Sequence, residues 1–200
     1  MLDLDLFENI FFFNIGPYRG DDSYFEWKAK SYYKASFFDI RLTRNAPYKD
    51  IFYCVAKEDL KLVYIVKKET VFTIGANPIV QSQLLEALIE YLINEFFETY
   101  DESLLMTCYA DSNTCPIFEG FRANTKYAFE NYSTLDLVKM SRVTCKGCNK
   151  TLNIIIKKST IEKSQKPTTP IVYVHSGHAL LVYVDKQYKV RGAELVSISY

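Results

Sequence analysis

Glycine is scarce in this chain, and the glycine-rich loops that cradle phosphate groups are missing. Only 7 of the 200 residues are glycine, and neither GxGxxG nor GxxxxGK followed by Ser or Thr occurs. Such loops need glycine because larger residues would keep the backbone N–H groups away from the phosphate oxygens. The sequence therefore gives no support to nucleotide binding through the common loop motifs.

A basic excess, a secretory signal and a long apolar run are missing as well. Lys and Arg total 24, as do Asp and Glu, whereas nucleic-acid-binding proteins usually carry a basic excess or stripe. Residues 1–9 lack the basic start of a signal peptide, and the longest apolar run, 10–13, is too short to span a bilayer. We therefore expect a cytoplasmic protein whose main partner is not nucleic acid.

The cysteines do not show the spacing of a disulfide framework. They number five, which is odd, and Cys54, Cys108 and Cys115 are scattered along the chain. Without a secretory signal, such cysteines fit a reducing compartment better than a disulfide scaffold. We expect these three side chains to be free thiols.

Apolar residues are plentiful and form strand-like runs. They make up 48% of the chain, with 16 Tyr and 14 Phe, which is enough for a sizeable core. Residues 6–15 predict a buried strand that ends at Gly16-Pro17, and residues 23–30 predict a weaker one. The runs 51–56, 62–66 and 71–74, separated by short charged turns, predict an antiparallel meander.

Two helices are expected after the meander. Asn77 and Pro78 fit an N-cap and a first helical position, and the apolar spacing continues to about Thr99. The apolar face of this helix, which includes Leu84, Leu88, Leu92 and Phe96, is expected to pack against the meander. A shorter helix is expected over 116–131. The row formed by Glu86, Glu90, Asn94 and Glu98 is interpreted as a solvated helix face rather than as a set of metal ligands.

The helical pattern stops near residue 133, and β-like sequence follows. Strands are expected at 151–156, 171–174, 179–184 and 188–198, with a loop rich in Lys, Ser, Thr and Pro over 157–170. The sequence thus predicts an α+β protein with a domain at 1–133 and a β-rich module at 134–200. A module this small rarely buries enough surface to fold unaided, so a bound metal would help to stabilise it.

Four metal-ligating residues occur as two pairs in that module. They are Cys145 and Cys148 in a CxxC motif, and the only histidines of the chain, His175 and His178, in an HxxH motif. Two residues between ligands allow a tight turn to direct both side chains at one ion, and four ligands close a tetrahedral zinc site. Gly147 and Gly177 are expected to supply positive φ angles in the two turns. We therefore predict structural Zn²⁺.

Other readings of the same residues stay open. The cysteines could form a redox pair, or the four residues could form no site at all. A catalytic zinc would require an open fourth position and a nearby base, for which Asp185 and Glu194 are the candidates. With such a catalytic zinc, the protein would be a zinc-dependent hydrolase.

Lysines and arginines accumulate after residue 138. A solvated basic face is the simplest explanation, and an anionic membrane surface is an alternative, since each cation near such a surface contributes about 1 kcal/mol. A nucleic-acid-associated zinc ribbon is a further alternative, with Tyr173, Tyr183 and Tyr188 as stacking groups.

The predicted order of elements resembles a known fold. Two strands, a linker, a three-strand meander, a long helix and a shorter helix resemble the longin fold of SNARE N-terminal domains, adaptor small subunits and the signal-recognition-particle receptor. Residues 51–56 and 84–100 are similar to the last core strand and the second helix of adaptor sigma subunits. The resemblance covers about residues 4–132. It places a first helix between 28 and 45, where Ser36 to Leu42 could equally form a strand.

The tail Ala179 to Gly192 resembles a small module found at the end of archaeal proteins, some of which carry longin or roadblock domains. In that module a CxxC precedes a Cys/His pair and a strand pair that begins with Val-Asp-Lys. The matching residues are Cys145, Cys148, His178 and Asp185-Lys186. The position of the module's usual Cys is occupied by Ser176 in this chain, so His175 would have to take its place as a ligand. The resemblances imply a non-enzymatic adaptor that binds a small GTPase or another longin or roadblock protein.

Overall fold

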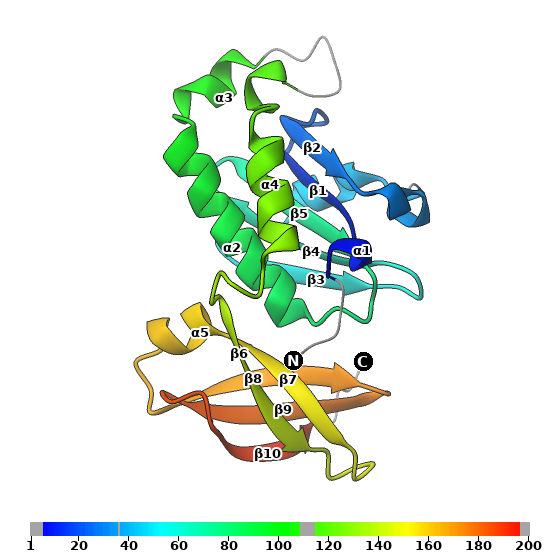
Figure 1. Cartoon of the computed structure of the whole chain (residues 1–200), viewed down its shortest axis with the longest axis vertical. Coiled ribbons are helices and arrows are strands. Elements are labelled where there is room, and N and C mark those ends of the chain that lie inside the picture. Colours follow the sequence, from blue (N-terminus) through cyan, green and yellow to red (C-terminus); the bar gives the residue numbers. More distant parts are fainter. Residues whose placement is uncertain (1–5, 36, 109–114, 197–200) are drawn as a thin grey trace. The chain divides into compact units, whose positions relative to one another are not determined.

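The computed structural model describes residues 6–35, 37–108 and 115–196, and the chain divides into two compact units (Figure 1). Unit 1 comprises Met1–Leu135 and unit 2 comprises Asp136–Tyr200. Both contain antiparallel strands and helices, so the expected α+β class is confirmed.

Unit 1 is built on one five-stranded antiparallel sheet. A short helix, α1 (Leu6–Asn9), replaces the first part of the expected strand 6–15. The strand order is β2-β1-β5-β4-β3, and the expected meander is confirmed as β3, β4 and β5. The strands are β1 (Ile10–Pro17), β2 (Phe25–Lys28), β3 (Phe52–Ala56), β4 (Lys61–Lys67) and β5 (Thr70–Ala76).

Two helices, α2 (Ser82–Thr99) and α4 (Phe121–Glu130), cover one face of this sheet (Figure 1). Phe96 on α2 packs edge to face against Phe72 of β5, with ring centroids 5.8 Å apart. Between these helices lie α3 (Ser103–Thr107) and the 3₁₀ helix η3 (Pro116–Phe118). The helix face predicted to be buried is confirmed, since Leu84, Leu88, Leu92 and Phe96 are all at most 1% exposed.

The expected start of the long helix was wrong. The helix begins at Ser82, and Asn77 instead closes a turn in which its side chain accepts a hydrogen bond from the Ile79 N–H at 3.1 Å. Asn followed by Pro serves a turn as well as a helix start, because the short polar side chain bonds the backbone two residues on in both settings.

The segment between β2 and β3 covers the other face of the sheet. It contains two 3₁₀ helices, η1 (Lys30–Ala35) and η2 (Ile40–Asn45), so no strand forms over the described residues 37–42. Arg44 is 1% exposed and donates to the Asn14 side chain and to the Val71 carbonyl. Burial lowers the pKa of Arg44 to about 10. A Cβ at Gly16 would collide with this guanidinium, which explains the glycine.

Unit 2 consists of a two-stranded and a three-stranded antiparallel sheet. The first pairs β6 (Val138–Thr144) with β7 (Thr151–Lys157), and the second has the order β10-β9-β8. Its strands are β8 (Thr168–His175), β9 (His178–Asp185) and β10 (Val190–Val196). Val143, Ile154 and Ile156 from the first sheet share a buried core with Leu180 and Val182 from the second.

Two elements of unit 2 were not expected from the sequence. Strand β6 was not expected, because its polar and apolar residues alternate weakly and Val143 is the one buried residue among its seven. Helix α5 (Lys158–Lys163) lies in the segment expected to be a loop. The end of the expected strand 188–198 falls at residues 197–198, which lie outside the described residues.

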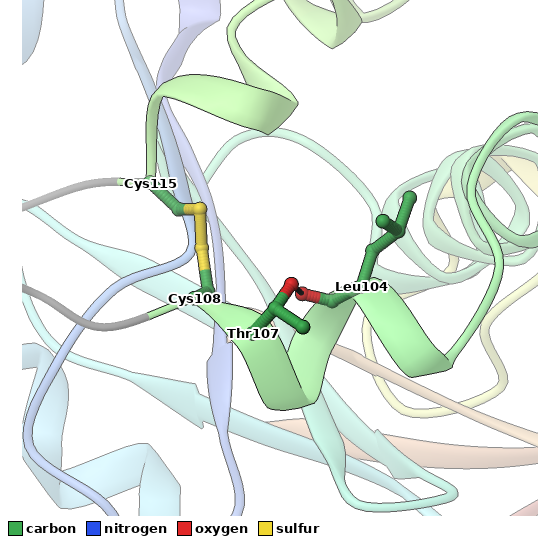
Figure 2. The surroundings of a disulfide bond; sticks show 4 residues. All are labelled: Leu104, Thr107, Cys108 and Cys115. Atoms are coloured by element: carbon green, nitrogen blue, oxygen red, sulfur yellow. Dashed lines mark hydrogen bonds between the residues drawn. A yellow bond between two sulfur atoms is a disulfide. The ribbon is translucent and has the colours of Figure 1, made fainter.

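Cys108 and Cys115 are joined by a disulfide (Figure 2). Their Cα atoms are 5.8 Å apart, because Cys108 follows the end of α3 and Cys115 precedes η3. The expectation of three free thiols is therefore wrong for this pair. Cys54 is free and exposed, as expected.

Candidate metal centre

The two sequence pairs meet at one end of unit 2. One ligand atom from each of Cys145, Cys148, His175 and His178 lies within 4.8 Å of the others. The Cys145 sulfur is 3.4 Å from His178 Nδ1, and the Cys148 sulfur is 4.0 Å from His175 Nε2. The structure thus brings together all four residues that the sequence singled out.

The CxxC turn connects β6 to β7. The Cys145 N–H donates to the Lys150 carbonyl at 2.9 Å, and the Asn149 N–H donates to the Cys145 carbonyl at 2.8 Å. The positive φ of this turn, 57°, belongs to Asn149 and not to Gly147 as expected. Gly147 is needed for space instead, because a Cβ there would lie 3.0 Å from the His178 ring and 3.3 Å from Leu195 Cδ1.

The HxxH turn is a two-residue hairpin between β8 and β9. Ser176 and Gly177 have φ angles of 46° and 77°, and two successive positive values are typical of the tight turns that suit hairpin twist. His175 and His178 are directly paired across the hairpin, so their side chains lie on the same face. Their ring centroids are 5.4 Å apart. The positive φ expected at Gly177 is confirmed.

The surroundings of Cys145 favour its thiolate form. Burial by itself raises the pKa of this thiol, but hydrogen bonds outweigh that effect and lower the pKa to about 6. In order of size, the donors are His175, the backbone N–H groups of Cys148 and Gly147, and His178. A thiolate is the form in which cysteine binds a metal.

The donor atoms fit a four-coordinate metal ion. Ligands about 2.0 to 2.3 Å from a tetrahedral ion lie roughly 3.3 to 3.8 Å apart, close to the separations of 3.4 and 4.0 Å seen here. Within the described residues, these four form the one His, Cys, Asp and Glu group able to hold a metal, and it contains no carboxylate. The arrangement can therefore bind a metal ion through protein ligands alone.

Neither candidate base of the hydrolase alternative belongs to this group. Asp185 ends β9, whereas His178 begins it, so the strand separates them. The Asp185 carboxylate accepts hydrogen bonds from the N–H groups of Gln187 and Lys189, both at 2.9 Å, and pairs with Arg191. These interactions, with the Lys189 backbone first, lower the pKa of Asp185. The residue shapes a turn.

Glu194 lies on β10 opposite Leu181 and is exposed. The adjacent Leu195 faces the metal ligands, as its contact distance to Gly147 shows. Because successive strand residues point to opposite faces, the Glu194 side chain points away from the ligands. Sequence analysis missed this packing role of Leu195, although its alternation with Glu194 was visible.

The basic residues of unit 2 serve several structural purposes. Asp136 bonds both Lys139 and Lys158, and these hydrogen bonds lower its pKa to about 2. Lys186 donates to the carbonyls of Ile161 and Ser164 at the end of α5. Such contacts satisfy carbonyls that a helix end leaves open.

Two of the three tyrosines proposed as stacking groups are engaged inside unit 2. The Tyr173 hydroxyl donates to the Ile155 carbonyl at 2.7 Å, and the Tyr188 hydroxyl donates to the Glu162 carboxylate at 3.0 Å. Both rings pack against the core. They are therefore not free to stack on bases.

No model of a known protein family matches the chain, and no curated protein does. Among the described residues, no helix combines the length and the apolar character needed to cross a membrane.

Proposed function

We propose that this chain is a non-enzymatic cytoplasmic adaptor in which a longin-like domain binds a small GTPase or another longin or roadblock protein. Unit 2 is a zinc-ribbon-like module stabilised by one structural Zn²⁺. The observation that carries the non-enzymatic part is the donor set: four protein ligands and no carboxylate in the group.

Zinc suits this donor set better than other ions. Two thiolates and two imidazoles in a tetrahedral arrangement are typical of structural zinc, whereas magnesium and calcium prefer oxygen ligands. Four protein ligands would leave no open position for a substrate or a reactive water. When bound, the ion would supply binding energy to the fold, and residues of both hairpins would hold it.

The architecture of unit 1 supports the longin-like assignment. Its sheet follows the order β2-β1-β5-β4-β3, with α2 and α4 on one face. The segment that joins β2 to β3 covers the other face, and the resemblance to longin domains expects a first helix within this segment. In this chain the segment forms η1 and η2, two short 3₁₀ helices, in place of a continuous α-helix.

The two edges of the sheet differ, and the difference indicates where a protein partner binds. At the β2 edge the chain supplies its own hydrogen bonds, since the Cys115 N–H donates to the Tyr24 carbonyl and Arg122 donates to the Glu26 carbonyl. At the opposite edge, β3 has no strand beyond it among the described residues. An open edge offers backbone groups for pairing with a strand of another protein.

The outward-facing positions of β3 follow from its hairpin. The Lys57 N–H donates to the Leu60 carbonyl, and the hydrogen-bonded pairs alternate from there to Val55 with Leu62. The backbone of Cys54, between two such positions, therefore faces outward. Residues 51–56 carry no charge, and edge strands that avoid pairing usually do. This strand is suited to binding.

An affinity experiment tests the proposal. The full chain would be used as bait in an extract of its native cells, with bound proteins identified by mass spectrometry. Val55→Lys places a charge on β3, where Val55 is 41% exposed, and should abolish capture of the partner. Leu42→Lys makes the same kind of change at a residue that is 66% exposed on η2, and should retain the partner.

A captured small GTPase or longin or roadblock protein that depends on Val55 would support the proposal. Capture that is lost equally in both variants, or metal-dependent hydrolysis of ester or amide substrates by the purified chain, would overturn it.

A further inference from the structure

Charge is strongly segregated between the two units. Unit 2 contains 11 Lys and Arg against 4 Asp and Glu, a net charge of +7, whereas unit 1 contains 13 against 20, a net charge of −7. The neutral total of the whole chain therefore conceals a basic module. A partner with a negatively charged surface is attracted to unit 2 and repelled by unit 1.

Exposed aliphatic side chains gather at the metal-binding end of unit 2. Val174 directly precedes His175, pairs with Ala179 and is 69% exposed. Ala179 in turn pairs with Val196, which is 39% exposed, and Leu195 beside Gly147 is 48% exposed. Val174 and Val196 lie on one face of the sheet and Leu195 lies on the other, because successive strand residues point to opposite faces. All three lie at the metal-binding end of the sheet, and we call them the aliphatic tip. Isolated exposed aliphatic residues are ordinary, but several at one tip mark an interaction site.

Basic residues without partners accompany the aliphatic tip. Lys146 and Lys150 lie in the CxxC turn and are exposed, as is Arg142 on the preceding strand. Among the described residues, no ion pair engages any of the three. Elsewhere in unit 2, Lys139, Lys158, Lys186 and Arg191 bond carboxylates or carbonyls, whereas Lys166 and Lys189 are exposed and, within the described part of the chain, form no ion pair.

We propose that the metal-binding end of unit 2 docks on an anionic lipid membrane, with the aliphatic tip in the interface and Lys146 and Lys150 against the headgroups. An anionic membrane would contact both the aliphatic tip and the two lysines. Aliphatic side chains gain free energy on entering the interface, and cations are attracted to acidic headgroups.

Nucleic acid matches the observations less well than a membrane. Single-stranded nucleic acid is bound by aromatic platforms, and two of the candidate tyrosines are engaged in the fold. Phosphates would pair with the lysines but would gain nothing from exposed valine and leucine. One carboxylate, Glu194, lies two positions from Val196 and reduces the local positive charge. The net charge of unit 2 remains strongly positive in spite of it.

The inference goes beyond the binding of a protein partner by unit 1, but it rests on the structural metal that holds the two turns together. The metal content of every sample should therefore be measured alongside lipid binding. A chain without metal would count against the proposed zinc site. A metal-loaded chain that ignores vesicles would overturn only the membrane inference.

Co-sedimentation of the full chain with lipid vesicles tests the inference. Binding is expected to vesicles of phosphatidylcholine mixed with phosphatidylserine, and to be far weaker with phosphatidylcholine alone. It should fall as salt rises, because the Debye length shortens from about 10 Å at 0.1 M to about 3 Å at 1 M.

Two pairs of substitutions locate the contact. Lys146→Gln with Lys150→Gln should weaken binding on the order of 25-fold, about fivefold for each cation lost from the headgroup region. Lys166→Gln with Lys189→Gln removes the same charge from exposed positions of unit 2 outside the CxxC turn, and should change binding less than about twofold. Val174→Ser with Val196→Ser should weaken binding while leaving the salt dependence unchanged.

Three results would overturn the inference. Equal losses in the two lysine pairs would show diffuse attraction without a defined contact. Unchanged vesicle binding by the variant with both valine substitutions would show that the aliphatic tip does not contact the membrane. Tighter binding to a single-stranded oligonucleotide than to the mixed vesicles, with the same lysine dependence, would assign the surface to nucleic acid.

Discussion

The two units reach a folded state by different means. Unit 1 buries a continuous layer of aromatic side chains between its sheet and helices, with Phe13, Phe72, Phe96 and Phe121 all at most 1% exposed. Unit 2 shares a smaller aliphatic core between two small sheets, and Cys145, a member of that core, is also a candidate ligand. Burial alone can account for the larger unit, while the smaller one would gain most from an additional link between its sheets.

The position of the four ligands shows what such a link would join. The cysteines lie in the turn of the two-stranded sheet, and the histidines lie in the hairpin of the three-stranded sheet. One ion would therefore fasten the two sheets together at one end. Binding of a structural zinc supplies on the order of 10 kcal/mol, which exceeds the whole stability of many small domains.

The largest effect is expected from loss of a ligand. Cys145→Ser should unfold unit 2 and leave unit 1 folded, because all four ligands of the proposed metal belong to unit 2. Hydrogen exchange read by mass spectrometry should show lost protection over residues 138–196 and retained protection in β1 and β5. Cys54→Ser, which alters an exposed cysteine of unit 1, is the matched control. Retained protection in unit 2 of Cys145→Ser would contradict the proposal that a metal stabilises this unit.

A cavity in unit 1 should have the next largest effect. Leu88 is fully buried under the sheet, so Leu88→Ala should lower the free energy of unfolding of unit 1 by about 2 to 5 kcal/mol. Chemical denaturation followed by the fluorescence of Trp27, which belongs to unit 1, measures this free energy. The metal content of the variant should not change. A loss under about 0.5 kcal/mol would show that the packing of α2 is misassigned.

Crowding of the CxxC turn should weaken the metal site without destroying it. Gly147→Ala places a methyl group 3.0 Å from the His178 ring, and displacing a ligand typically lowers metal affinity about 10- to 100-fold. Competition with a chromophoric chelator measures the affinity. Gly192→Ala has its nearest neighbour at 3.7 Å and should bind metal normally. Equal affinities for the two variants would contradict the assigned turn geometry.

The sequence predicted the parts of the fold that depend on local patterns. The strands of the meander and the buried face of α2 were predictable because β-branched runs and a helical apolar stripe are local signals. The helix start at Asn77 was wrong, since Asn-Pro serves turns and helix starts alike. Strand β6 was missed because its pattern becomes clear only when β7 pairs with it.

The candidate site was predictable in its residues but not in its geometry. Two pairs of ligand types at fixed spacing are visible in the sequence, whereas the separation of Asp185 from them follows from the length of β9. Gly147 was expected to supply a positive φ and instead makes room for His178. The disulfide between Cys108 and Cys115 depends on where two helix ends meet, which no local pattern specifies.

X-ray absorption at the zinc edge of the purified full chain tests the central claim most directly. The account predicts one zinc per chain with two sulfur ligands at about 2.3 Å and two nitrogen ligands at about 2.0 Å. Gently purified protein that contains no zinc, or a bound zinc with three protein ligands and a water oxygen, would contradict the account.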